Sequence, residues 1–139
     1  MLKSALMICV ALVALAWTDA VVAEETVAAT TNQTQNIKRI PLQRFDIPGT
    51  TYETVIGIAE IAPNVSVGRH THPGVESGYV IEGGFDLVID GEAPRLLKAG
   101  DSYQVPARTA HDAKTGPDGA KVIATYVVEK DQPIASAAE

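Results

Sequence analysis

The sequence predicts an all-β fold with a single domain, arranged as a closed antiparallel barrel or a sandwich. Short apolar and β-branched stretches alternate with turn residues along most of the chain. After the N-terminal apolar run, no segment shows the apolar period of an amphipathic helix. A length of 139 residues suits one hydrophobic core and leaves little room for a second. Closure of the sheet is favoured because it removes exposed strand edges.

Residues 1–23 have the pattern of a secretory signal peptide. Lys3 supplies a positive charge, an apolar run covers residues 5–17, and small residues precede a suitable cleavage point before Glu24. A transmembrane anchor is the alternative, but the run is shorter than the roughly 20 residues that cross a bilayer, and Asp19 interrupts it. We therefore expect a secreted or periplasmic protein with no membrane contact after cleavage.

The rest of the chain divides into a linker, a folded domain and a tail. Segment 24–36 is rich in Thr, Ala, Gln and Asn and is expected to be flexible, as is the tail over 131–139. The domain is expected over 37–130, with a two-residue hairpin at Asp90-Gly91 and a turn at 116–119. The expected strands cover residues 51–61, 78–81, 85–89, 95–97, 102–105 and 121–128.

Cysteine and charge content exclude several classes of partner. Cys9 is the only cysteine and lies within the expected signal, so the mature chain has no disulfide and no thiol ligand. The formal net charge is −6, and loss of Lys3 and Asp19 with the signal leaves the balance unchanged. A dispersed acidic surface argues against nucleic acid or anionic membrane as a partner.

The first of two histidine segments reads Gly-Arg-His-Thr-His-Pro-Gly-Val-Glu over residues 68–76. Alternate side chains of an extended chain point to one face, so His70 and His72 should project together. Glu76 has the same parity, but Pro73-Gly74 must turn the backbone before the carboxylate can return to the imidazoles.

The second segment runs over residues 100–111 and ends at His111, the third and last histidine of the chain. A single histidine is usually exposed or a satisfied polar group of the core. Three histidines with Glu76 favour a different interpretation. Neutral imidazoles and one carboxylate suit a divalent transition metal ion such as Mn, Fe, Co, Ni, Cu or Zn, with positions left for water or substrate.

These two segments resemble the two conserved motifs of the cupin superfamily, small antiparallel jelly-roll barrels that hold a metal ion in the barrel mouth. In the first motif, the spacings from His72 to Glu76 and from Glu76 to Gly83 agree with the family pattern. Gly68 lies closer to the histidine pair than the family's leading glycine does. The resemblance covers residues 56–128 and implies a cupin barrel.

In the second motif, Gly100, Pro106 and His111 have the family spacing, whereas Arg108 and Thr115 replace a usual glycine and asparagine. These departures do not touch the implied ligands. The resemblance therefore implies one metal ion held by four side chains, His70, His72, Glu76 and His111.

Four side chains are candidates for roles beyond simple ligation. Glu76 is either a fixed fourth ligand, which we favour, or a carboxylate that takes a proton from substrate. Tyr79 and Tyr126 are candidates to present hydroxyls to the cavity, with packing at the barrel rim as the alternative. Arg108, three residues before His111, is a candidate to hold an anionic substrate, with simple solvent exposure as the alternative.

The function expected from these residues is that of an exported metal-binding cupin. The resemblance implies a metalloenzyme acting on a small oxygen-rich molecule by dioxygenase, isomerase or decarboxylase chemistry. The alternatives are a non-catalytic metal-binding or ligand-binding protein and a structural accessory of an envelope complex. A homodimer through the N-terminal strand is also expected, because a small barrel gains buried apolar area by pairing.

Overall fold

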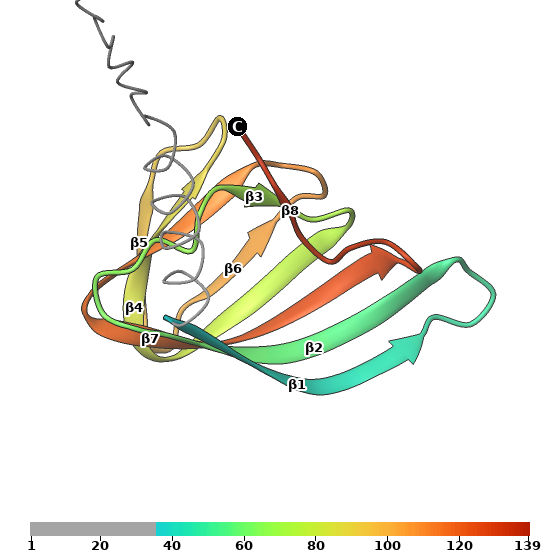
Figure 1. The fold of residues 1–139 in the computed structure, drawn as a ribbon, viewed down its shortest axis with the longest axis horizontal. Coiled ribbons are helices and arrows are strands. Elements are labelled where there is room, and N and C mark those ends of the chain that lie inside the picture. The colour runs from blue at the N-terminus through green and yellow to red at the C-terminus, as the bar shows by residue number, and fades with distance from the viewer. Residues whose placement is uncertain (1–35) are drawn as a thin grey trace, which may run out of the picture.

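A computed structural model describes residues 36–139 as one antiparallel sheet curled on itself (Figure 1). The expected signal peptide and the linker up to residue 35 lie outside the described residues. Over residues 36–139 every regular element is a strand, so the all-β prediction is confirmed. The strands are β1 (Ile37–Asp46), β2 (Tyr52–Ile61), β3 (His70–Thr71), β4 (Val75–Ile89), β5 (Arg95–Lys98), β6 (Ser102–Val105), β7 (His111–Glu129) and β8 (Ser136–Ala137).

Strand β7 is the centre of the sheet. The strand order is β1-β2-β7-β3-β8, and β4 pairs with β5, β6 and β7. Figure 1 shows β1 and β2 on one side of β7, with β4, β5 and β6 curling round the other. No helix in the described range is long and apolar enough to cross a membrane.

The turn expected at residues 116–119 is absent, because the 19-residue strand β7 continues through this segment. β7 pairs with β4 on both sides of this segment: Thr115 lies opposite Phe85, and Ala120 lies opposite Gly83, with a shift in register between them. Gly119 has φ of +67°, which lets the strand bend without reversing. Pairing with one neighbour on both sides of the segment outweighs its local preference for a turn.

A tight turn does form at Asp90-Gly91, where the Glu92 N–H donates to the Ile89 carbonyl at 3.0 Å, but it is not the two-residue hairpin expected. Gly91 has positive φ, but Asp90 is not among the residues in the left-handed region. β4 lies between β5 and β7, and Phe85, Asp86 and Leu87 pair with both. Pairing with β5 stops at Leu87, whereas pairing with β7 continues to Ile89, so the connection from β4 to β5 is longer than two residues.

The hydrophobic core lies between β4, β5, β6 and β7. Inward side chains of β4 alternate with exposed ones, and Phe85 and Leu87 are almost completely buried. The ring of Phe85 meets Tyr103 of β6 edge to face at 5.7 Å. Each buried side chain of this size contributes roughly 1.5–3 kcal/mol relative to exposure. The buried cluster consists of Val80, Phe85, Leu87, Ile89, Leu97, Val105, Ala120 and Val122.

The last residues of the sequence pack in the sheet, contrary to the flexible tail expected over 131–139. β8 pairs with β3, placing Ala137 opposite His70, and the Ala138 N–H donates to the Arg69 carbonyl at 3.0 Å. Short β3 has a free edge whose peptide groups need partners, and the tail supplies them. Composition alone carries no information about such a distant partner.

Candidate metal centre

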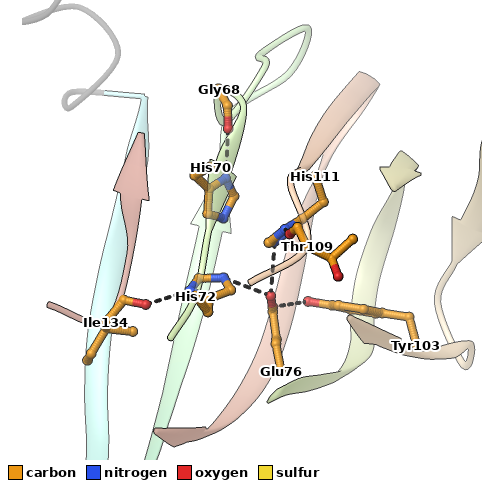
Figure 2. Close-up of polar contacts among 8 residues, drawn as sticks. All are labelled: Gly68, His70, His72, Glu76, Tyr103, Thr109, His111 and Ile134. Carbon is orange, nitrogen blue, oxygen red and sulfur yellow. Dashed lines mark hydrogen bonds and ion pairs between the residues drawn. The ribbon is translucent and has the colours of Figure 1, made fainter. Parts of the chain in front are cut away.

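The two histidine segments meet because β3 pairs with the first residue of β7. His70 lies directly opposite His111 in this pairing, and His72 follows two residues later. The ring centroids are 4.2 Å apart for His70 and His111, 4.9 Å for His70 and His72, and 5.0 Å for His72 and His111. One ring nitrogen from each residue lies within 4.8 Å of the others. The structure thus brings the three predicted histidines to one point (Figure 2).

Glu76 reaches the same point from the start of β4. Its Oε2 lies 3.0 Å from His72 Nε2 and 3.3 Å from His111 Nε2, and the side chain is buried. The chain returns from His72 through Gly74, where an added Cβ would lie only 1.8 Å from the Val127 carbonyl oxygen. The close packing of this turn on β7 requires glycine and explains how the carboxylate comes back to the imidazoles.

The second nitrogen of each imidazole faces a main-chain carbonyl. The Nδ1–O distances are 2.7 Å from His70 to Gly68, 2.6 Å from His72 to Ile134, and 3.0 Å from His111 to Thr109. Because a carbonyl only accepts, Nδ1 carries the proton in each neutral ring, and Nε2 presents a lone pair. This arrangement is typical of histidines that bind metal through Nε2.

The Nε2 atoms of His72 and His111 are buried, and in the neutral rings no hydrogen-bond donor among residues 36–139 faces them. The nearby carboxylate of Glu76 cannot satisfy them, since it has no proton to donate. Lone pairs and a negative charge directed at one point require either added protons or a metal ion. The residues present fit a divalent metal ion on this ground.

The same arrangement shifts the acid–base behaviour of the metal-free site. Burial by itself raises the pKa of Glu76, but His111 and His72 outweigh it and lower that pKa to about 2. Burial tends to lower the pKa of His111, yet hydrogen bonds with Glu76 and the Thr109 carbonyl raise it overall. Burial lowers the pKa of His70. Glu76 and His111 thus favour each other's charged forms.

Tyr103 is a site residue that sequence reasoning missed. It lies on β6 and its hydroxyl donates to Glu76 Oε1 at 2.8 Å, which holds the carboxylate with Oε2 toward the histidines. Burial and the neighbouring Glu76 raise the pKa of Tyr103, so the phenol remains a donor. Tyr103 lies in the second histidine segment, on the strand before His111, and this position could have indicated a role at the site.

A cavity of about 550 Å³ opens beside the histidines. His70, His72 and His111 form part of its wall with Glu76, and the remaining wall is mainly apolar. Residues 134–137 close one side. Tyr126 also lines the cavity, with its ring 4.8 Å from that of His72, so this predicted candidate does lie at the site.

Tyr79 and Arg108 do not line this cavity. On the first part of β4 the inward positions are those of Glu76 and Val80, so Tyr79 points outward and is 49% exposed. Arg108 is exposed with φ of +59°, a conformation that favours glycine. Its main-chain N–H donates to the His72 carbonyl at 2.8 Å, so its backbone supports the site while the side chain lies outside the cavity.

Comparison with known proteins agrees with this geometry. A family model described as a cupin domain matches residues 57–127, about half of the chain. The chain belongs to the cupin family. The fold predicted from the two histidine segments, a single-domain antiparallel jelly roll, is therefore confirmed. No curated protein matches this cupin.

Several solved structures share the fold. DMSP lyase DddQ from Ruegeria pomeroyi DSS-3 has a TM-score of 0.64 at 15% identity, over 75% of this chain and 52% of that chain. This cupin thus spans about half of the lyase. KdgF from Halomonas sp. has a TM-score of 0.56 at 23% identity, over 70% and 83%. Polyketide cyclase RemF from Streptomyces resistomycificus has a TM-score of 0.57 at 25% identity, over 70% and 69%.

Proposed function

We propose that this cupin is a metal-dependent enzyme acting on a small oxygen-rich molecule bound in the cavity. The observation that carries the proposal is the set of unpartnered, buried Nε2 atoms directed at one point on the cavity wall. Such a site can hold an ion and still offer it to a ligand on the cavity side. The lyase and the cyclase among the similar structures support catalysis only as analogy of fold.

The residues have distinct roles in this proposal. His70, His72 and His111 hold the ion through Nε2, and Glu76 is the fourth ligand, oriented by Tyr103. A bound divalent ion supplies Lewis-acid polarisation of a substrate oxygen. Burial and the charge of Glu76 raise the pKa of Tyr126, so its phenol stays protonated and can donate to a substrate oxygen beside His72.

The second candidate is a non-catalytic metal-binding or ligand-binding role, which is compatible with Glu76 acting as a ligand rather than as a base. The pKa of Glu76 is lowered to about 2, and a carboxylate of such low basicity is a poor acceptor of a substrate proton. Reactions that begin with proton abstraction by Glu76 are therefore disfavoured. The ligand role of Glu76 serves both candidates equally.

The proposal also includes export and self-association. The N-terminal pattern of Lys3, an apolar run and small residues supports secretion to the periplasm or outside the cell. Among the strands of residues 36–139, β1 is an edge strand that pairs only with β2, and it exposes Leu42 and Phe45 to about half of their full extent. A homodimer formed through β1 would cover this apolar edge.

Elemental analysis followed by turnover assays tests the function. Metal-free protein is reconstituted separately with Mn, Fe, Co, Ni, Cu and Zn, and His111→Ala serves as the site variant. We expect at least one ion at one equivalent in the wild type and its loss in the variant. Absence of stoichiometric metal in every preparation contradicts the proposal. Bound metal with ligand binding, but without turnover of any oxo acid or hydroxy acid tried, favours the second candidate.

A further inference from the structure

Arg39 is a residue of β1 beside the cavity. Arg39 lines the cavity together with its β1 neighbours Ile37, Ile40 and Pro41, and its side chain is exposed. Lys38, of opposite parity, pairs instead with Glu60 at 3.0 Å. Arg39 is therefore a charged side chain on the face of the sheet that encloses the cavity, at the edge where solvent enters.

Within residues 36–139, Arg39 differs from the other charged residues of β1 because it has no ion-pair partner. The pairs made by the others are Lys38 with Glu60, Arg44 with Glu53, and Asp46 with Lys130, at 3.0, 2.6 and 2.8 Å. Arg69 also lines the cavity, but it binds Asp90 and the main-chain oxygen of Glu139. Arg39 is thus the cation left available to a bound molecule.

Small residues lie between Arg39 and the histidines. In the sheet register, Arg39 is opposite Ala59, and the next inward row contains Gly57 and Ala124. Ala59, Gly57 and Ala124 line the cavity as small apolar residues, between larger lining residues such as Val55 and Val122. Arg39 and Tyr126, the tyrosine beside His72, both line this cavity. A molecule bound at the histidines can therefore extend toward Arg39.

We infer that Arg39 binds the carboxylate of the substrate, which is a small organic anion with three parts. One end carries oxygens that face the metal, the middle is a short apolar chain over Gly57 and Ala59, and the far end is the carboxylate. The guanidinium fork matches a carboxylate with two parallel hydrogen bonds. The inference rests on the proposed function, because it assumes a metal site open to the cavity. It also replaces Arg108, which lies outside the cavity, as the anion-binding arginine.

Two matched probes test the inference by calorimetry on zinc-loaded protein. Butanohydroxamate and succinic monohydroxamate share a metal-binding group and a chain length, but they end in a methyl group and a carboxylate. We expect the wild type to bind the carboxylate probe about tenfold more tightly, the effect of one charge-assisted contact. Arg39→Gln should remove this preference without changing affinity for the methyl probe, and Arg39→Lys should retain part of it.

Lys38→Gln is the matched control, since it removes a positive charge from the opposite face of the same strand. It should leave both affinities unchanged, and elemental analysis should show equal zinc in all variants. A second measurement needs no variant: added salt should reduce the preference of the wild type, because the contact lies at the solvent edge.

The outcomes separate the two proposals. Equal binding of both probes by the wild type, or a preference that survives in Arg39→Gln, overturns the role of Arg39 and leaves the metal site intact. Failure of zinc-loaded wild type to bind either probe contradicts the proposed function, because it means that the ion has no position open to the cavity. Should Arg39→Gln fold poorly, a salt-independent preference in the wild type overturns the inference by itself.

Discussion

Two sides of the same sheet differ in what their inward positions carry. The filled side, made by β4, β5 and β6, presents large side chains such as Phe85 and Leu87, which are almost completely buried. The hollow side, made by β1, β2 and the end of β7, presents Gly57, Ala59 and Ala124 over the cavity. Strand alternation is the same on both sides, and the smaller side chains of the hollow side leave space for the cavity, which Phe85 and Leu87 border from the filled side.

This division assigns stability and binding to different residues. The filled side excludes water and supplies hydrophobic free energy, whereas the hollow side leaves space beside buried polar groups. β7 belongs to both, with Val122 in the buried cluster and His111 at the metal centre. Substitutions on the two sides should therefore have separable effects on unfolding and on ligand binding.

The largest effect is expected from Phe85→Ala on the filled side. Removing a fully buried ring leaves a cavity that neighbouring strands cannot close. The free energy of unfolding should fall by about 3–5 kcal/mol. Urea unfolding measures it. Leu96→Ala on β5 is the control, since Leu96 is 74% exposed and should change stability by less than about 0.5 kcal/mol. Similar losses in the two variants would contradict a core on this side.

A second effect is expected from acid on the metal-free protein. The pKa of Glu76 is lowered from 4.5 to about 2, so its stabilisation is complete above pH 4.5 and is lost as the pH falls toward 2. The linked free energy is at most about 3 kcal/mol. His111 has a raised pKa, so its contribution is present below pH 6.5 and is lost as the pH rises through the folded value.

Thermal unfolding of metal-free wild type and Glu76→Gln across the acid range measures this dependence. The variant should show a flatter profile below pH 4.5, because the group that titrates is gone. Parallel profiles in the two proteins would show that Glu76 is not held ionised by the histidines.

A third effect is expected from removing residues 132–139, which deletes the carbonyl that faces His72 Nδ1. Loss of such an orienting partner lowers metal affinity by about tenfold or more. Competition with a chelator measures the affinity. Thr50→Ala is a control in a distant exposed turn and should leave metal binding unchanged. Unchanged affinity after the deletion would show that His72 keeps its orientation without Ile134.

The smallest effect on stability is expected from Ala59→Leu on the hollow side. The added methylene groups enter existing space, so unfolding free energy should change by less than about 1 kcal/mol. Calorimetric binding of succinic monohydroxamate should nevertheless be lost. Ala120→Leu, within the packed cluster, should instead cost about 1–3 kcal/mol. A reversed order of stabilities would contradict the assignment of the two sides.

Sequence reasoning succeeded where the signal is local and failed where a distant partner decides. The parity of His70 and His72, and the need for a turn before Glu76, follow from a few neighbouring residues. The turn at 116–119 and the flexible tail were wrong, because long-range pairing with β4 and β3 overrides local preference. No pattern in the sequence shows that Arg39 faces the cavity while Arg108 does not.

The sequence by itself determined the all-β class, the candidate metal-binding donors and their spacing within each segment. Alternation and turn chemistry act over a few residues, so these features can be inferred without the rest of the chain. Only the tertiary structure decided that His70 lies opposite His111, that Ile134 orients His72 and that Tyr103 holds Glu76. Register and packing join residues far apart in sequence, and their energies depend on which surfaces meet.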